Sequence, residues 1–127
     1  MKIVFIVDDN DANLLLAKNA LEGLYETYAL PSAARMFKII EKITPDLILL
    51  DVDMPEMDGF EAIQLLKTNE KYTAIPVAFL TGKYEAESEE RGFALGAVDF
   101  IRKPFSAATL IERVETHIGS GDSGDTL

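Results

Sequence analysis

Five short runs of apolar residues alternate with stretches of helical periodicity, and this alternation constrains the fold of the 127-residue chain more than any other feature. Short, continuously apolar strands between helices indicate a parallel sheet that is covered on both faces. Right-handed crossovers leave few topologies, and five strands suit an open, doubly wound α/β sheet in the order 2-1-3-4-5. The predicted strands are 2–7, 27–30, 46–50, 76–80 and 98–101.

Five helices are predicted after these strands, and several carry start or stop signals. Ser32 can cap the second helix, and Asp58 has capping-box spacing with Glu61 at the start of the third. The fourth helix has glutamates crowded at its start and few large apolar residues, so we expect it to have low local stability. The helices are predicted over 10–24, from 32 until Pro45 stops the second, from 58, over 85–95 and over 106–118.

The charge balance excludes several classes of function. Acidic residues outnumber basic ones 22 to 12, which opposes direct binding of nucleic acid or an anionic membrane surface by this segment. No apolar run approaches the roughly 18 residues of a membrane span, and the acidic turn after the first strand is unlike a secretory signal, so a cytoplasmic protein is expected. We expect one domain over 1–118, with the Gly-, Ser- and Asp-rich residues 119–127 as a flexible tail or the start of a linker.

Polar residues follow four of the predicted strands at the edge where parallel sheets bind ligands. Asp8 and Asp9 follow the first strand, Asp51 ends the third, Thr81 ends the fourth, and Lys103 follows the fifth. Converging carboxylates cannot all stay ionised without compensation, and Mg²⁺ with oxygen ligands is the natural partner. Each residue alone has a structural interpretation, such as a helix cap or a turn, but their coincidence at one edge indicates a site for a phosphoryl group.

Four stretches in this order, VDDN, LLDVDMPEMDGFE, FLTG and FIRKPF, carry a resemblance to a known family. From Lys2 to Ile118 the chain resembles the receiver domain of two-component response regulators, and chemotaxis regulators in particular. The resemblance implies a flavodoxin-like fold and a signalling role in which a sensor histidine kinase or phosphotransfer protein donates a phosphoryl group. It implies no enzyme activity beyond catalysis of this transfer and slow autodephosphorylation.

The resemblance also implies roles for the acids and the lysine of the site. Asp51 would be the phosphoacceptor. Asp9, Asp51 and the backbone carbonyl of Asp53 would bind Mg²⁺, with Asp8 in the outer shell. Lys103 would pair with the phosphoryl oxygens.

Two further residues would make up the switch. Thr81 would hydrogen-bond the phosphoryl group, and Phe100 occupies the switch-aromatic position and would swing inward. The bond between Lys103 and Pro104 is cis in the family. The readout face would be formed by the fourth helix, the fifth strand and the fifth helix.

Two side chains beside the site are candidates for tuning it. Asp53 lies two residues after Asp51, and Lys83 lies two residues after Thr81. An ion pair between Asp53 and Lys83 would restrict attacking water and lengthen the phosphoryl lifetime. Because an exposed pair is worth about 0–1 kcal/mol, the expected effect is on rate and not on stability.

Three other functions are compatible with parts of the sequence. DVDMP resembles the motif of haloacid-dehalogenase-type phosphatases, although Pro55 stands where Thr or Val belongs. A flavodoxin-type binding module has the expected sheet, but its phosphate loop would be acidic here. A receiver that signals through binding, without phosphorylation, is the third.

The last expectations concern association and the single histidine. A downstream protein or a following output domain would read the switch. A homodimer through the fourth helix, fifth strand and fifth helix would use charges of both signs. We expect His117, near the end of the fifth helix, to be exposed to solvent. The charged residues near the proposed dimer face are Arg91, Asp99, Arg102, Glu112 and Arg113.

Overall fold

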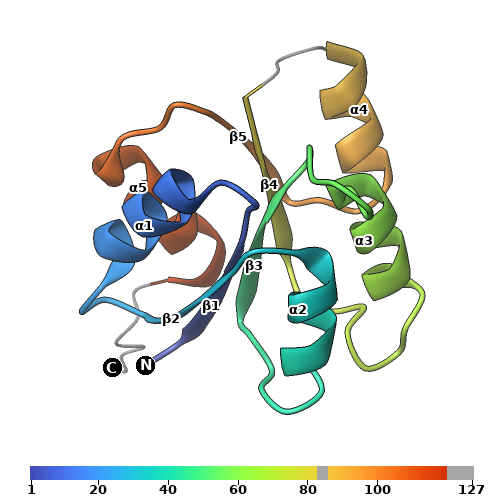
Figure 1. The fold of residues 1–127 in the computed structure, drawn as a ribbon, viewed down its shortest axis with the longest axis horizontal. Coiled ribbons are helices and arrows are strands. Elements are labelled where there is room, and N and C mark those ends of the chain that lie inside the picture. The colour runs from blue at the N-terminus through green and yellow to red at the C-terminus, as the bar shows by residue number, and fades with distance from the viewer. Residues whose placement is uncertain (83–85, 120–127) are drawn as a thin grey trace.

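Strands and helices alternate strictly along the chain, as Figure 1 shows for a computed structural model that describes residues 1–82 and 86–119. The strands are β1 (Ile3–Val7), β2 (Glu26–Leu30), β3 (Leu47–Asp51), β4 (Val77–Thr81) and β5 (Asp99–Arg102). The helices are α1 (Asp11–Leu21), α2 (Ala33–Ile39), α3 (Gly59–Lys67), α4 (Ala86–Ala94) and α5 (Ala107–Ile118).

The five strands form one parallel sheet in the order β2-β1-β3-β4-β5, which confirms the predicted flavodoxin-like α/β fold. Helices α1 and α5 cover one face, and α2, α3 and α4 cover the other (Figure 1). Every residue of β3 and β4 is buried, as their continuous apolar sequences predict for central strands. Among the described residues, none of the helices is both long and apolar enough to cross a membrane.

Two apolar cores lie on opposite sides of the sheet. Alternate residues of each strand point to opposite faces, so neighbouring residues of one strand enter different cores. In β3, Ile48 packs in the core beneath α2 and α3, whereas Leu49 packs in the core beneath α1 and α5. The sheet is thereby held from both sides, and its carboxyl edge becomes a fixed platform.

Three strand boundaries differ from prediction in a way that matters for the site. Strands β3, β4 and β5 each begin and end one residue later than the predicted apolar runs, and Asp51 and Thr81 are the last residues of their strands, as predicted. Parallel pairing continues through them: Asp51 is paired with Leu80, and Thr81 with Arg102. Both polar side chains are therefore set on ordered strand backbone.

Two helices are shorter than predicted because the chain turns before the apolar pattern ends. Helix α1 stops at Leu21, since Glu22 is extended and Gly23 has a φ of 84°. Helix α2 stops at Ile39, and Ile40 follows as its cap. The capping predictions are confirmed: the Ser32 side chain accepts from Arg35 N, and Asp58 with Glu61 forms the full capping box of α3.

Candidate functional site

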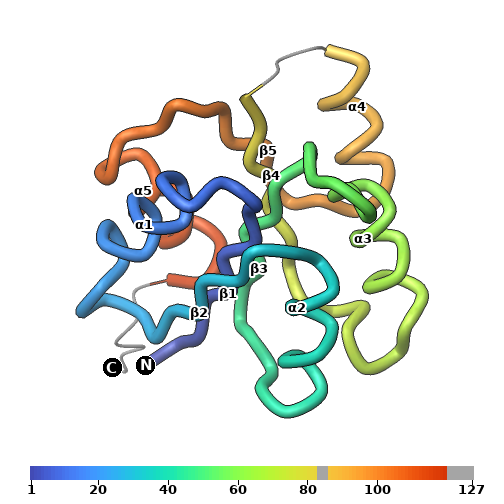
Figure 2. The backbone as a smooth tube through the Cα atoms, in the orientation of Figure 1, coloured from blue at the N-terminus to red at the C-terminus, as the bar shows by residue number. Residues whose placement is uncertain are grey.

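Three carboxylates converge where β1 and β3 end. Asp8, Asp9 and Asp51 each offer an oxygen within 4.8 Å of the others, as the sequence predicts. The tube in Figure 2 shows the segments that follow β1 and β3 leaving the same edge of the sheet. Asp8 and Asp51 are buried, at 0% and 3% exposure, while Asp9 is exposed. The cluster is therefore closed on its inner side and open to solvent through Asp9.

Lys103 brings a positive charge to the two buried acids. Its Nζ lies 2.7 Å from Asp8 Oδ2 and 3.1 Å from Asp51 Oδ1, and it donates a hydrogen bond to the latter. The bond from Lys103 to Pro104 is cis, as expected from the resemblance. Burial opposes the charge of the ammonium group, but the two carboxylates outweigh it and raise the pKa of Lys103.

One cation does not balance the acids. Burial, and after it the charge of Asp8, raises the pKa of Asp51 to about 7, and the nearby Lys103 offsets only part of that rise. A carboxyl group that titrates near neutral pH has no full counter-charge in its surroundings. Further positive charge at the site would therefore be electrostatically favourable.

The hydrogen bonding of Asp8 also supports a divalent cation at this site. Asp8 Oδ1 accepts a hydrogen bond from Asn10 N at 2.9 Å, whereas the buried Asp8 Oδ2 has only the Lys103 ammonium, 2.7 Å away, as a charged neighbour among the described residues and no assigned hydrogen bond. Such an oxygen retains its capacity to bind a cation or a metal-bound water. Carboxylate oxygens are the ligands that Mg²⁺ prefers.

Thr81 is placed at the same edge. It is 2% exposed, and its backbone carbonyl accepts a hydrogen bond from Lys103 N at 2.7 Å. This bond ties the end of β4 to the residue that carries the ammonium group. Asp53 is exposed at the start of the loop after β3, and Lys83, its predicted partner, lies outside the described residues.

A glycine that the sequence analysis did not single out shapes the acceptor loop. Gly59 N donates to Val52 O at 2.9 Å, which folds the loop back on the end of β3. A Cβ at Gly59 would lie 2.5 Å from the backbone carbonyl oxygen of Asp51, which is a steric clash. The Asp-Gly pair ahead of a helix was the available signal for such a close turn.

Phe100, the predicted switch aromatic, lies inward in this structure. The residue is only 6% exposed, and its ring packs edge-to-face against Phe79 with centroids 5.8 Å apart. The ring has no hydroxyl that would need a partner in water.

The prediction that His117 is exposed is wrong. Its Nε2 lies 2.9 Å from Asp99 Oδ2, and its side chain is only 18% exposed. Arg113 pairs with the other oxygen of Asp99 at 2.6 Å. Burial works to raise the pKa of Asp99, but bonds from His117, Arg113 and the Phe100 amide lower it overall. Helical spacing placed both α5 residues near the helix end without revealing that Asp99 lies beside them.

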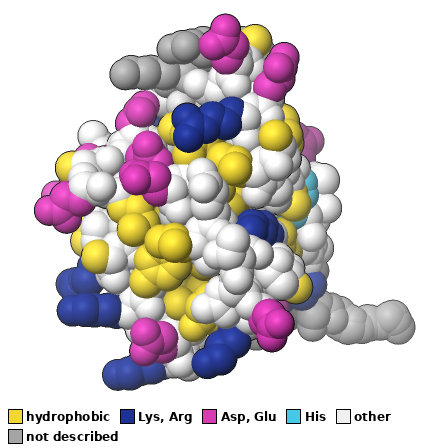
Figure 3. Space-filling view, turned by 90° about the vertical axis from the view of Figure 1, so that its right-hand side faces the viewer, with side chains coloured by type: hydrophobic (Ala, Val, Ile, Leu, Met, Phe, Trp, Pro, Cys, Tyr) yellow, Lys and Arg dark blue, Asp and Glu magenta, His cyan; other side chains and the backbone are white. Residues whose placement is uncertain are grey.

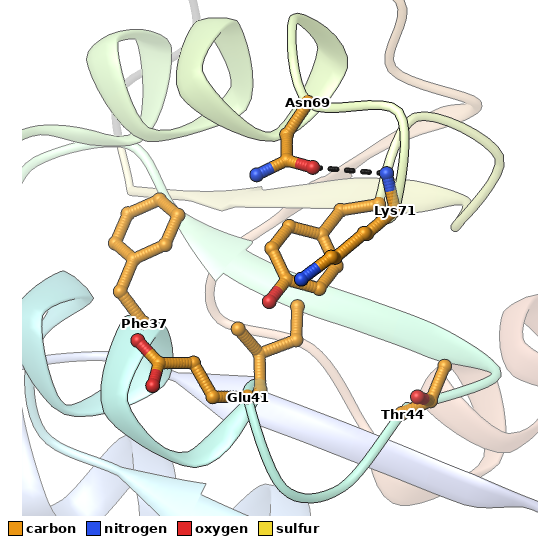
Figure 4. Close-up of a pocket in the computed structure, with 7 residues that line it drawn as sticks. Phe37, Glu41, Thr44, Asn69 and Lys71 are labelled. Atoms are coloured by element: carbon orange, nitrogen blue, oxygen red, sulfur yellow. Dashed lines mark hydrogen bonds between the residues drawn. The ribbon is translucent and has the colours of Figure 1, made fainter.

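The largest described cavity is remote from the acids. It has a volume of about 760 Å³ and lies between the end of α2 and the segment after α3, near the amino ends of the strands (Figure 4). Asn69 Oδ1 accepts a hydrogen bond from Lys71 N across one wall. Its mixed lining includes Glu41, Lys71 and Tyr72 but none of the residues of the carboxylate site. The lining residues are Phe37, Ile40, Glu41, Thr44, Asn69, Lys71 and Tyr72.

Comparison with known proteins gives one consistent family. Residues 4–115 match the family described as response regulator receiver domain. The polar-differentiation response regulator DivK of Brucella ovis is 34% identical over 93% of this chain and 97% of its own length. A probable cyclic di-GMP phosphodiesterase of Vibrio cholerae is 42% identical over 98% of this chain, but the match spans only 28% of that protein.

Solved structures agree with the sequence matches. The chemotaxis protein CheY4 of Vibrio cholerae superposes with a TM-score of 0.87 at 28% identity, over 92% of this chain and 98% of that one. Neither a haloacid-dehalogenase-type phosphatase nor a flavodoxin-type binding module is favoured by these matches.

The raised pKa of Asp51 predicts a specific pH dependence of stability without metal. The folded protein holds a proton on Asp51 that the unfolded chain releases above its ordinary pKa of 3.8, so stability should fall as pH rises toward about 7. In EDTA, the free energy of unfolding from urea titrations should decline by up to about 1.4 kcal/mol per pH unit between about pH 5 and 6, and level off above about pH 8. Asp51→Asn is the control and should lack this decline; an equal decline in both proteins would contradict the assignment.

Gly59→Ala should disturb the acceptor loop. The new Cβ must displace the Asp51 carbonyl, and overpacking of this kind destabilises by about 1–3 kcal/mol. Gly82→Ala is a matched control, because a Cβ there meets nothing within 4 Å. Thermal unfolding of the two variants measures the difference, and equal melting temperatures would argue against the close approach.

Proposed function

Because this chain belongs to the family of response regulator receiver domains, we propose that Asp51 is the residue that accepts the phosphoryl group. The observation that carries the proposal is the position of its buried carboxylate beside Asp8, Asp9 and the Lys103 ammonium at the end of β3. The donor is the phosphohistidine of a sensor histidine kinase or of a phosphotransfer protein. We propose residues 1–118 as the receiver unit and 119–127 as a tail or the start of a linker.

Asp51 acts as the nucleophile of the transfer. One carboxylate oxygen attacks the phosphorus, the bond from phosphorus to the histidine nitrogen breaks, and its electron pair stays with the imidazole. The product is an acyl phosphate on Asp51. Lys103, already 3.1 Å from Asp51 Oδ1, pairs with the phosphoryl oxygens, and Thr81 donates its hydroxyl to one of them.

Mg²⁺ is the proposed cofactor. Asp9, Asp51 and the backbone carbonyl of Asp53 are its proposed ligands, and the buried Asp8 would hold a metal-bound water from the outer shell. When bound, the ion supplies positive charge that neutralises the oxygens of the transferring group. The domain catalyses its own phosphorylation and slow dephosphorylation and needs no further enzyme activity.

The phosphoryl signal is read on the face formed by α4, β5 and α5. A downstream protein or an output domain is the proposed reader, and the cytoplasm is the proposed compartment. A homodimer through this face is compatible with its charges, but Asp99 and Arg113 already pair within the protomer. Those two residues would have to exchange partners if they were to pair across a dimer.

Asp51→Asn should abolish phosphorylation. Incubation with acetyl phosphate and Mg²⁺ should add one phosphoryl group to the wild-type protein, as read by intact mass spectrometry, and none to the variant, because an amide is not the required nucleophile. EDTA should reduce wild-type labelling strongly. Asp11→Asn, at an exposed position in the first turn of α1, should label normally. Labelling of the Asp51 variant at another residue would defeat the assignment.

Lys83→Ala should shorten the lifetime of the acyl phosphate, if Asp53 and Lys83 shield it from water as proposed. A pair worth about 0–1 kcal/mol corresponds to an acceleration of up to about fivefold. The loss of labelled protein after removal of acetyl phosphate measures the rate. Lys18→Ala on α1 serves as the control, and identical lifetimes in all three proteins would remove Lys83 from the mechanism.

A further inference from the structure

Helix α4 is attached to the domain through an unusually small contact. Gly92 is its only buried residue among those described. A Cβ at Gly92 would lie 3.0 Å from the Phe79 ring and 3.1 Å from the Phe100 ring, so the helix backbone rests directly on two aromatic rings. Figure 3 shows the face that carries α2, α3 and α4, with acidic side chains gathered over α4 at its upper end. Neither aliphatic packing nor these charges fix the helix in place.

The rings beneath α4 belong to a row of four phenylalanines. Phe60 and Phe79 meet edge-to-face with centroids 5.3 Å apart, and Phe79 meets Phe100 in the same way at 5.8 Å. Phe93 of α4 continues the row, with its centroid 6.4 Å from that of Phe100. Phe60 directly follows Gly59, the residue that packs on the Asp51 carbonyl. The row therefore connects the acceptor loop with α4.

Arg91 of α4 contacts Phe60, the ring at the other end of the row. Its guanidinium carbon lies 4.4 Å from the centroid of the Phe60 ring, in cation–π geometry. Three consecutive residues of α4 thus hold the row: Arg91 on Phe60, Gly92 on Phe79 and Phe100, and Phe93 on Phe100. The Arg91 contact joins α4 to α3, and so to the element that begins at the acceptor loop.

Helix α4 buries less than α5 does, since Gly92 is its single buried residue whereas α5 buries Leu110 and Val114. Phe100 is 6% exposed, so its ring already lies against the core. Helix α4 begins at Ala86, shortly after Thr81 ends β4. The residue proposed to bind the phosphoryl group and the start of α4 are therefore close together along the chain.

We propose that the contact of Arg91 with Phe60 is a latch that holds α4 in its unphosphorylated position and opposes activation. This inference rests on the proposed function, in which Asp51 accepts the phosphoryl group. If occupation of Asp51 loosens the latch, then loosening the latch must strengthen binding at Asp51, because coupling between two sites is reciprocal. The latch thereby sets how readily the domain is activated.

Arg91→Ala tests the latch with beryllofluoride, an analogue of the phosphoryl group. Isothermal titration calorimetry at fixed Mg²⁺ should show two- to fivefold tighter binding than in wild type, which corresponds to the about 0.5–1 kcal/mol of an exposed cation–π contact. Amide hydrogen exchange in α4 should be faster in the free variant. Arg35→Ala, an exposed arginine of α2, should change neither quantity.

Gly92→Ala supplies an independent variant. Alanine strengthens an isolated helix, but here its Cβ must push α4 away from the two rings. Beryllofluoride should again bind more tightly, although α4 itself is intrinsically more helical. Tighter binding by Gly92→Ala would therefore indicate displacement of the helix and not fraying of its ends.

Phe60→Leu identifies the ring as the partner of Arg91. Leucine keeps most of the apolar volume but removes the π face, so Arg91→Ala should have no further effect on affinity in the Phe60→Leu background. Full additivity of the two changes would overturn the pairing.

The outcomes separate the latch from the proposed function. Failure of the wild-type protein to bind beryllofluoride in a Mg²⁺-dependent way would remove the proposed function and the latch together. Normal wild-type binding with an unchanged or weaker affinity in Arg91→Ala would overturn the latch alone.

Discussion

The ammonium group of Lys103 is the interaction on which the functional edge of this domain depends. It lies within 3.1 Å of one oxygen of each of two carboxylates that are almost inaccessible to solvent. Two buried like charges without a cation would destabilise the fold by several kcal/mol. One ammonium does not neutralise three acids, however, and burial, followed by the charge of Asp8, still raises the pKa of Asp51 to about 7. The fold therefore tolerates the cluster while leaving it ready for additional positive charge.

That arrangement requires the parallel sheet. Asp8, Asp51, Thr81 and Lys103 are far apart in sequence, and they meet because the strands that precede them all run in one direction. The central strands β3 and β4 are buried along their whole length, so Asp51 and Thr81 are held by strands that are packed on both faces. Hydrogen bonding of Lys103 N to the Thr81 carbonyl fixes β5 to the same edge. A site built on such strands keeps its geometry without help from a ligand.

The sequence was most informative where a residue's role follows from its place in the repeating pattern. Apolar runs predicted every strand, and the polar residues at the ends of the first, third and fifth runs predicted the clustering of Asp8, Asp9, Asp51 and Lys103. The wrong predictions concern residues whose surroundings are set by tertiary packing. Periodicity places His117 near a helix end, but only the packing of α5 beside β5 brings it to Asp99.

The packing beneath α4 could not be predicted from the sequence, because it also depends on tertiary neighbours. A pattern search counts aliphatic residues at helical spacing, and α4 has few. Its backbone instead lies against rings contributed by β4 and β5. A glycine within a helix lowers the predicted helix propensity. The close packing that it permits depends on residues elsewhere in the chain, so the sequence pattern does not reveal it.

The contrast between α4 and α5 shows how the fold divides its two tasks. Helix α5 buries Leu110 and Val114 in the core beneath it, and further bonds reach its end from Tyr25 and Lys2. Helix α4 buries a single glycine and depends on aromatic contacts at its flanks. Since aliphatic burial contributes about 1.5–3 kcal/mol for each large side chain, a helix without it can change position for far less free energy than one with it. Firm packing at the carboxylate edge and weak attachment of α4 are thus complementary: the first preserves the geometry of the site, and the second is what the proposed latch depends on.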